Sequence, residues 1–487
     1  LFFWNEVMEY VITVGLEIHL KLATATKIFC PCKNEQNLDD NHPNTTVCPV
    51  CTGQPGALPQ LSEEVVKKGL LLGKALKCAV QNPSSFDRKS YFYPDLPMGY
   101  QITQFYRPIN VNGQLSFFSE TFDEERTVTI TDAHLECDTA KVLHYNGKML
   151  LDFNRAGTPL IEIVTGPDFQ SADEAVAFAK EIQRIAKYNQ ISDADMEKGQ
   201  MRVDVNVSIR PSLDAPFGTR VELKNINSFS AIKRAIETEV KRQLACREAN
   251  ESINQETRRR DDLKGVSFTM RSKEDALDYR YFPEPDLPEL QLKNELLDEV
   301  NASDILLPYE KIKEMKSDFG FHKEFINVLI NDKEVLDFFY DLVKMGFWPK
   351  LVAKWIAGPI SAYMTANAVA ISELKIDREQ LISFFKLAEE GKLIENQLKI
   401  LMDELLNHWG DLQEIIKEKW FDAPAVSEDE ITEVAKGVLD ANPQIVEQYK
   451  GGKVTVIGFF VGQVMKQTQW KANPKQIQEI MTRLLSA

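Results

Sequence analysis

Several stretches of the sequence alternate apolar residues with acids and histidines, the side chains that bind metal ions and move protons. Residues 11–21 place Glu17, His19 and Lys21 on one face of a predicted strand, with leucine and isoleucine on the other. Acids among apolar neighbours are costly to bury unless they are paired or bind a cation. Carboxylates with one histidine and no thiolate suit Mg²⁺ better than Zn²⁺.

The same alternation recurs further along the chain. Residues 132–138 align His134, Glu136 and Asp138 on one face of a predicted strand. Two more predicted strands carry acids, Glu162 in residues 160–164 and Asp204 in residues 202–209. Two interpretations remain open at this point. The strands are neighbours and share a metal site, or their polar faces are the solvated outer sides of antiparallel strands.

A second kind of metal ligand is concentrated in one short region. Four of the seven cysteines lie within residues 30–51, and the second pair has the form Cys-Pro-x-Cys-x-Gly of a zinc knuckle. Four thiolates in two close pairs suit a structural, tetrahedral zinc site. The alternatives are disulfides, which a reducing cytoplasm disfavours, or free thiols that happen to cluster. The predicted zinc ligands are Cys30, Cys32, Cys48 and Cys51.

Cations and aromatic side chains are interleaved in residues 86–97, which include Arg88, Lys89 and Tyr91. Such interleaving suits stacking on bases and contact with phosphates. It equally suits a packed strand followed by a proline-rich turn. No phosphate-binding loop, kinase signature or Gly-x-Ser-x-Gly elbow is found, so ATP use does not follow from a motif.

The overall charge limits the partners of the chain. Its 487 residues include 57 basic and 73 acidic side chains, a formal charge of −16, which excludes a general polyanion binder. Residues 441–487 are the exception, with a local excess of lysine and arginine. No apolar run has the roughly 20 residues that span a bilayer, and the first residues lack the pattern of a signal peptide. We therefore expect a cytoplasmic protein with no membrane contact.

The elements that must position these side chains change in type along the chain. Period-two alternation and frequent turns dominate residues 1–292, which predicts a β-rich, antiparallel domain with the cysteine-bearing loop at 30–51. A proline-rich connection at 283–288 leads to helical patterns over residues 293–408. A small helical tail follows at 409–487. The predicted fold class is α+β.

Several long blocks of the sequence carry a family resemblance. Before the tail, these blocks are residues 15–19, 86–97, 99–102, 154–162, 202–206, 222–229, 256–259 and 278–286. In the tail they are residues 458–466 and 472–474. With these blocks the chain resembles GatB of the tRNA-dependent amidotransferase, in its bacterial type, over nearly its whole length, and blocks of this length are highly specific. The tail blocks resemble the YqeY-like end of that family.

The resemblance implies an ATP-dependent carbon–nitrogen ligase that uses glutamine as amide donor. Members of the GatB family phosphorylate the side-chain carboxylate of Glu-tRNA(Gln), and often of Asp-tRNA(Asn), and ammonia then displaces the phosphate. The amidase subunit of the heterotrimer supplies the ammonia through a channel, and the small subunit clamps the two larger chains together. The implied architecture is a β-rich cradle for the acceptor end, a helical domain and a YqeY-like tail that contacts the tRNA body.

The resemblance also assigns roles to residues. The implied cofactors are ATP, Mg²⁺ and a structural Zn²⁺. The residues implied to contact substrate, tRNA or the ammonia channel are Arg88, Lys89, Tyr91, Arg202, Lys453 and Lys466. The residues implied to form the catalytic Mg²⁺ site, which lie on the polar strand faces found above, are Glu17, His19, Glu136, Glu162 and Asp204.

The sequence departs from the family pattern at two places. Where the family has two consecutive glutamates, this chain has Glu136 followed by Cys137, so one ligand is missing if the second acid is the true one. Met98 stands where many relatives have lysine, in a stretch associated with the ammonia path. Several relatives lack the four cysteines, so the zinc site is a subgroup feature.

Two alternatives to the amidotransferase component differ in what they require of the chain. An archaeal-type relative that acts only on Glu-tRNA(Gln) carries a large inserted domain before the tail, and 487 residues leave no room for it. The other alternative is a non-catalytic, zinc-stabilised tRNA-binding scaffold whose strand acids are merely solvated. Activity lost in Glu17→Ala with tRNA affinity unchanged would eliminate the scaffold.

Overall fold

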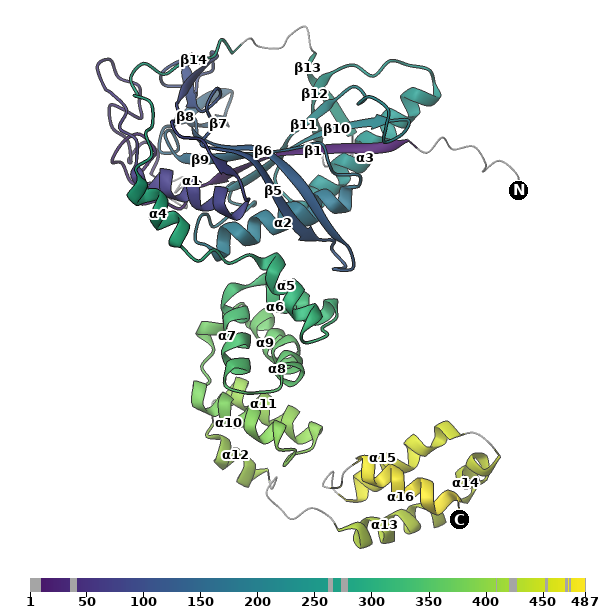
Figure 1. The fold of residues 1–487 in the computed structure, drawn as a ribbon. Helices are drawn as coiled ribbons and strands as arrows, with labels where there is room; N and C mark the ends of the chain where they lie inside the picture. Colours follow the sequence, from purple (N-terminus) through teal and green to yellow (C-terminus); the bar gives the residue numbers. More distant parts are fainter. Residues whose placement is uncertain are drawn as a thin grey trace. The chain divides into compact units, whose positions relative to one another are not determined.

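The computed structural model describes residues 10–35, 42–261, 266–272, 279–408, 410–419, 427–451, 454–468, 472 and 474–486. The chain divides into two compact units, residues 1–323 and residues 324–487. In the described parts, the first unit combines sheets with helices and the second contains helices (Figure 1). This confirms the predicted mixed fold, with an N-terminal sheet and C-terminal helices. The predicted division at residues 292 and 408 stays a prediction.

One large twisted sheet organises the first unit. Its strand pairs are antiparallel except for one, in which β11 and β12 run parallel. The strands follow each other across the sheet in the order β13 (Val266–Ser272), β12 (Glu256–Asp261), β11 (Val221–Ile226), β10 (Met201–Arg210), β1 (Val11–Lys21), β9 (Pro159–Thr165), β6 (Glu125–Cys137), β5 (Asn110–Phe118) and β2 (Ala79–Val80). The strands predicted at 11–21, 160–164 and 202–209 are therefore adjacent, with β1 in the middle.

The apolar face of this sheet forms the main hydrophobic core. In β1, Leu16, Ile18 and Leu20 are buried and point to this side, because successive strand side chains alternate between faces. The face is covered by α1 (Glu63–Ala75), α2 (Ala172–Tyr188) and α3 (Phe229–Glu248), as Figure 1 shows. Ser171 and Ser228 begin α2 and α3 by accepting a backbone N–H from the first turn. The opposite face of the sheet carries the polar side chains.

Two smaller β structures accompany the large sheet. The first is a three-stranded sheet in the order β14 (Phe282–Pro283), β3 (Asp87–Ser90) and β4 (Tyr100–Thr103). The second is a hairpin of β7 (Lys141–Tyr145) and β8 (Lys148–Asp152). Because β4 contacts β6, the segment with Lys89 and Tyr91 lies beside the polar face of the large sheet.

The remaining elements are helical. The first unit ends with α4 (Asn294–Ala302) and α5 (Pro308–Ser317). The helical patterns predicted over residues 293–408 are confirmed. The following helices are α6 (Lys323–Asn331), α7 (Lys333–Lys344), α8 (Pro349–Trp355), α9 (Ser361–Asn367), α10 (Arg378–Glu389), α11 (Glu395–His408) and α12 (Leu412–Glu418).

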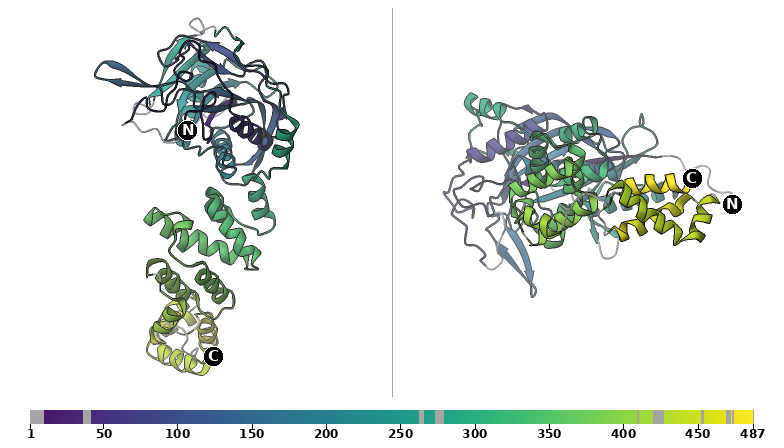
Figure 2. Two further views of the ribbon diagram at one scale, coloured as in Figure 1. Left: turned by 90° about the vertical axis from the view of Figure 1, so that its left-hand side faces the viewer. Right: turned by 90° about the horizontal axis from the view of Figure 1, so that it is seen from below.

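The end of the chain has a hydrophobic core of its own. Its helices are α13 (Glu428–Asp440), α14 (Pro443–Lys450), α15 (Ile457–Gln467) and α16 (Pro474–Ser486), the last two drawn in yellow in Figures 1 and 2. Ile431, Phe460 and Met481 are among the buried side chains at the centre. No helix within the described ranges is long and apolar enough to cross a bilayer.

Candidate active site

The register of the large sheet places the polar side chains of four strands next to each other. In β1, Glu17 lies opposite Asp204 of β10, and His19 lies opposite Glu162 of β9. On the other side of β9, Glu162 lies opposite His134 of β6. Across the sheet, one row therefore consists of the imidazole of His19, the carboxylate of Glu162 and the imidazole of His134. The alternation of each strand is compatible with this row, but it does not determine which strands are neighbours.

A first cluster of possible metal ligands consists of His19, Glu136 and Glu162, whose ligand atoms all lie within 4.8 Å of one another. The Nδ1 atom of His19 is 3.2 Å from a carboxylate oxygen of Glu136 and 3.7 Å from one of Glu162. Gln101 donates a hydrogen bond of 3.2 Å to the second oxygen of Glu136. His134 contacts Glu162 from the far side, with Nε2 3.4 Å from the carboxylate.

A second cluster, with oxygen ligands alone, lies beside the first on the same face. It consists of Glu17, Asp204 and Glu222, again with ligand atoms within 4.8 Å. Asn206 donates a 2.9 Å hydrogen bond to Glu17. The ammonium of Lys224 lies between the other two acids, 3.3 Å from Asp204 and 2.8 Å from Glu222. A positive charge is therefore already favourable at this place.

Burial and mutual charge shift the pKa values of these groups in opposite directions. Burial, reinforced by the charge of Glu162, raises the pKa of Glu17. Burial alone would raise the pKa of Glu162, but the imidazoles of His19 and His134 hold it well below the usual range. Burial alone would lower the pKa of His134, yet the charge of Glu162 and the bond to Asp132 raise it to about 10. Glu162 is therefore the fixed negative charge of the site.

Both clusters open onto one cavity of 750 Å³, which Lys89 and Tyr91 also line. An aromatic wall borders it, in which the rings of Phe105 and Tyr281 stack at 4.0 Å with an angle of 7° between their planes. The ammonium of Lys89 lies 5.0 Å from the centre of the Tyr279 ring. Burial alone would lower the pKa of Lys89, but nearby acids of the first cluster outweigh it and raise that pKa. The cavity thus combines acids, a partly buried cation and aromatic faces for stacking.

The other side chains singled out in the sequence have varied surroundings. Arg202 lies opposite His19 in the register and pairs with Asp138 at 3.5 Å. Arg88 is held by two hydrogen bonds of 2.8 Å to the buried Glu284 and packs on the Tyr100 ring. Lys466 is exposed on α15, and Lys453 lies outside the described residues.

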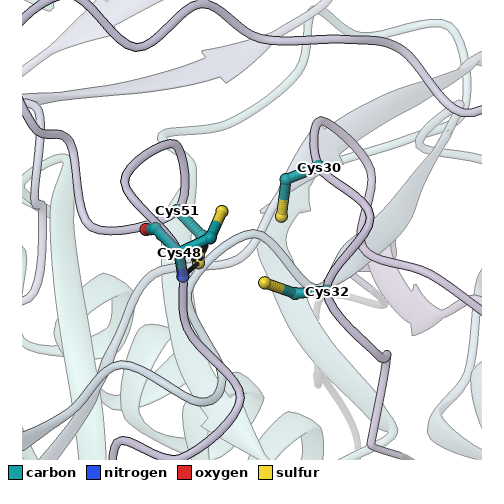
Figure 3. Close-up of side chains that lie close together, drawn as sticks. All are labelled: Cys30, Cys32, Cys48 and Cys51. Carbon is teal, nitrogen blue, oxygen red and sulfur yellow. Dashed lines mark hydrogen bonds between the residues drawn. The ribbon is translucent and has the colours of Figure 1, made fainter.

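The four cysteines converge as expected for one metal site, with all four sulfur atoms within 4.8 Å of one another (Figure 3). The sulfur atoms of Cys48 and Cys51 are 3.9 Å apart, close to the about 3.8 Å that tetrahedral zinc with bonds of about 2.3 Å requires. A hydrogen bond from Cys30 lowers the pKa of Cys51 to about 5, with a smaller contribution from the nearby Lys27. A thiolate, the form that binds zinc, is therefore present at neutral pH.

Neighbouring residues fix the shape of this cysteine loop. The ammonium of Lys27 is fully buried and donates to the carbonyls of Thr46 and Phe153 at 2.9 and 3.3 Å and to the Cys51 sulfur at 3.6 Å. Gly53 has a φ of +64°, and a Cβ there would lie 2.8 Å from the backbone of Pro97. The glycine of the Cys-Pro-x-Cys-x-Gly pattern is thus required by both conformation and space. None of the described residues of this loop lines the cavity that the acids border.

Comparison with known proteins agrees with this geometry. The sequence pattern of the GatB/GatE catalytic domain matches residues 12–298, which contain the sheet, both clusters and the cavity. The chain belongs to the GatB/GatE family. The pattern of the GatB domain matches residues 337–485, in the C-terminal helices.

Individual GatB relatives match along most or all of their length. A protein of Crocosphaera subtropica, named as the B subunit of aspartyl/glutamyl-tRNA(Asn/Gln) amidotransferase, is 41% identical over 98% of both chains. A Clostridium beijerinckii protein of the same name is 41% identical over 98% of this chain and all of its own. The chloroplastic/mitochondrial B subunit of glutamyl-tRNA(Gln) amidotransferase from Ricinus communis is 42% identical over 98% of this chain and 88% of its own.

The departure from the GatB pattern after Glu136 has a structural explanation. Glu136 points to the polar face, where it contacts His19, whereas Cys137 is buried in the main hydrophobic core. Because neighbouring strand residues face opposite sides, an acid at position 137 would enter that core. The cysteine therefore does not remove an acid from the first cluster.

Reasoning from the sequence missed two members of the site. His134 lies on a predicted polar face but is outside the predicted ligand set, and Glu222 is not singled out at all. The sequence does contain a signal for Glu222, since Glu222 and Lys224 alternate with Val221 and Leu223 as in a strand with one polar face. Their placement depends on β11 pairing with β10, where Glu222 lies opposite Asn206.

Proposed function

We propose that this chain is the GatB subunit of a glutamyl/aspartyl-tRNA amidotransferase. In this function it phosphorylates the side-chain carboxylate of Glu-tRNA(Gln), Asp-tRNA(Asn) or both, and then amidates it. One observation carries the proposal: two clusters of metal-ligating side chains share one face and one cavity with a partly buried lysine, within the part of the chain that matches the GatB/GatE catalytic domain.

The donor atoms of the two clusters fit Mg²⁺. The second cluster offers carboxylate oxygens only, and the first adds one imidazole to two carboxylates, a set that favours a hard cation over zinc. The residues that would hold the ions are His19, Glu136 and Glu162 in the first cluster and Glu17, Asp204 and Glu222 in the second. When bound, Mg²⁺ neutralises the phosphate oxygens of ATP and orients the transferred group.

The proposed reaction has two steps, phosphoryl transfer and amide formation. An oxygen of the substrate carboxylate attacks the terminal phosphorus of ATP, and ADP leaves. The nitrogen of ammonia then attacks the acyl carbon, phosphate leaves and the nitrogen loses a proton. The partly buried Lys89 ammonium, which interacts electrostatically with Glu136 and Glu162, would bind the anionic oxygens of substrate and product phosphate. The stacked rings of Phe105 and Tyr281 would take a terminal base of the tRNA.

The remaining predictions complete the proposal. The partners would be an amidase, which supplies ammonia from glutamine, and the small third chain of the heterotrimer. Arg88, Tyr91 and Arg202 would help to shape the substrate site or channel, and Lys453 and Lys466 would contact tRNA phosphates. Zn²⁺ would be bound by Cys30, Cys32, Cys48 and Cys51, and the protein would act in the cytoplasm.

The proposal is tested with the heterotrimer reconstituted from this chain, the amidase and the small third chain, together with ATP, Mg²⁺, and labelled Glu-tRNA(Gln) or Asp-tRNA(Asn). Ammonium replaces glutamine in a parallel assay, so that amidation is measured independently of the amidase. We expect ATP-dependent amide formation by the wild-type chain and its loss in Glu17→Ala and Glu162→Gln, with tRNA affinity unchanged. No product from either tRNA in both assays would refute the function and favour a tRNA-binding scaffold.

A further inference from the structure

Among the residues that the structure describes, no carboxylate is paired with the buried ammonium of Lys27. The residue is 0% exposed, and burial of a charge is unfavourable unless a group of opposite charge offsets it. Its hydrogen bonds go to the carbonyls of Thr46 and Phe153, at 2.9 and 3.3 Å, and to the sulfur of Cys51 at 3.6 Å. Because carbonyls are neutral, the Cys51 sulfur is the only group in this set that can carry a negative charge.

The sulfur of Cys51 accepts a second hydrogen bond, from the backbone. The N–H of Cys48 donates to it at 3.2 Å, in addition to the ammonium of Lys27. Hydrogen bonds to the charged form of a group favour that form. Two donors from different parts of the loop therefore stabilise the thiolate of Cys51.

A second lysine of the same loop has different surroundings. Lys33 follows Cys32 directly, yet its side chain is 72% exposed and pairs with Glu35 at 3.2 Å. Solvent screens an exposed ion pair of this kind, which contributes little free energy. Of these two lysines, Lys27 is the one whose charge is directed at the cysteine cluster.

The negative charge near Lys27 would increase when a metal binds. The sulfur atoms of the four cysteines lie within 4.8 Å of one another (Figure 3), and zinc binds them as thiolates. Four thiolates and one Zn²⁺ together carry two excess negative charges, of which one ammonium offsets half. Because the ammonium is buried, this attraction is little screened by salt. Lys27 thus favours the metal-bound chain over the metal-free chain.

The turn before β9 holds Lys27 in this position. Phe153, whose carbonyl accepts from the ammonium, lies in the connection between β8 and β9. Gly157 of the same connection has a φ of +82°, and a Cβ there would lie 3.4 Å from the Lys27 side chain and 3.5 Å from the Cβ of Cys51. The backbone of the turn therefore packs directly against both residues and keeps the charge beside the sulfur.

We propose that Lys27 is the counter-ion of the zinc–thiolate centre, a positioning residue that raises the zinc affinity of the four cysteines by offsetting the charge at the Cys51 sulfur. The inference rests on the zinc site of the proposed function. It goes further because it assigns part of the metal affinity to a residue that is not a ligand. Partners of metal ligands typically change metal affinity by about 10–100-fold.

The test measures the zinc affinity of the full chain by competition with a chelator. Lys27→Met keeps an unbranched side chain but removes the charge, and we expect its Kd for zinc to rise about 10–100-fold. Lys33→Met is the matched control, because it removes an exposed lysine from the same loop. We expect the Kd of Lys33→Met to equal that of the wild type.

A spectroscopic measurement separates the effect of charge from that of loop shape. With Co²⁺ in place of zinc, we expect the thiolate-to-metal charge-transfer band of Lys27→Met to move to lower energy, because a thiolate without a counter-ion is a better electron donor. The ligand-field bands of tetrahedral Co²⁺ should keep their wild-type intensity. If these bands weaken while the charge-transfer band keeps its energy, Lys27 only shapes the loop and the inference is wrong.

The other outcomes also decide the question. Wild-type zinc affinity in Lys27→Met, or an equal loss in Lys33→Met, would overturn the inference. A wild-type chain that binds neither Zn²⁺ nor Co²⁺ would refute it together with the zinc site, but not the amidation activity, which the amide-formation assay tests separately. Thermal unfolding shows whether each variant is folded. Lys27→Gln, which keeps a donor for the two carbonyls, replaces Lys27→Met if the latter is not.

Discussion

The carboxylate of Glu162 lies between two imidazoles, and this single charge governs the electrostatics of the first cluster. It lies 3.7 Å from Nδ1 of His19 and 3.4 Å from Nε2 of His134. The pKa of His134 is consequently about 10, above its ordinary value of 6.5. An ionised His134 stabilises the metal-free fold fully below pH 6.5, and this contribution is lost as the pH rises toward 10.

We therefore predict that Glu162→Gln lowers the pKa of His134 in the metal-free chain. The neutral amide keeps the shape of the side chain but removes the charge that favours the imidazolium. Titration of the imidazole resonances by NMR, in the presence of a chelator, measures the shift. Glu379→Gln, in α10 and outside the unit that holds the clusters, is the control. An unchanged titration of His134 in Glu162→Gln would show that Asp132 alone sets its protonation.

The cysteine cluster leads to a second prediction about single residues. We expect the purified wild-type chain to hold one zinc ion, and Cys51→Ser to lose it, because Cys51 is the thiol whose pKa is lowered to about 5. Elemental analysis after dialysis measures the metal. Cys78→Ser is the matched control, since Cys78 lies outside the cluster. Zinc retained by Cys51→Ser, or absent from the wild type, would contradict the assignment.

At the scale of the element, successive residues of β1 have different roles, because one face of the strand packs in the core and the other lines the cavity. Leu16 is 1% exposed and faces the core, and Glu17, the next residue, faces the cavity. The same strand thus contributes to folding through one face and to the site through the other. Because Leu16 and Glu17 lie on different faces, substitutions at these two adjacent residues can test the two roles separately.

We predict that Leu16→Ala lowers the free energy of unfolding by about 2–5 kcal/mol, because it leaves a void in the main core. Glu17→Ala removes an acid whose pKa is raised by burial, so its ionised form gains nothing from folding and its loss costs little stability. Urea denaturation of the two variants, together with the amidation assay, measures both effects. The prediction fails if Glu17→Ala unfolds as readily as Leu16→Ala or keeps full activity.

The pairing of β11 with β10 is a second feature of the elements on which the site depends. It brings Glu222 beside Asp204 and completes the second cluster. Similarly, the alternation of β6 decides that Glu136 and not residue 137 faces His19. Cys137, one of the two departures from the family pattern, therefore leaves the acids of the first cluster in place, because it falls on the core face of the strand.

At the scale of the whole molecule, acidic and basic side chains are distributed unevenly along the chain. The sheet of the first unit gathers acids, whereas the last residues, 441–487, hold a local excess of lysine and arginine within an acidic chain. A separate hydrophobic core supports the helices of this tail. Exposed lysines there would contact tRNA phosphates without reading sequence.

We predict that Lys466→Ala raises the KM for tRNA without changing kcat, because the lysine contributes binding away from the reacting atoms. The slope of log affinity against log salt should become shallower by about 1, as one phosphate contact is lost. Lys344→Ala, at an exposed lysine of α7, is the matched control. An equal effect of both variants on tRNA affinity would mean that Lys466 acts only through net charge.

The types of elements, the two faces of the strands and the family could be predicted from the sequence alone. Alternation in residues 11–21 assigns Leu16 to the core and Glu17 to the polar face, because side-chain direction in a strand has a period of two. The cysteine spacing likewise predicts one zinc site, because ligands so close in sequence need little help from the fold. Long blocks of residues carry the resemblance to GatB.

Which polar faces meet depends on the tertiary structure. The order β11-β10-β1-β9-β6 joins strands up to about 200 residues apart in sequence, and such long-range pairing leaves no local signal. That order brings His134 beside Glu162 and Glu222 beside Asp204 on the polar face. The pairing of Arg88 with Glu284 depends on the smaller sheet, in which β3 lies beside β14. The type of a residue is known from the sequence, but its neighbours across a sheet depend on strand order and register.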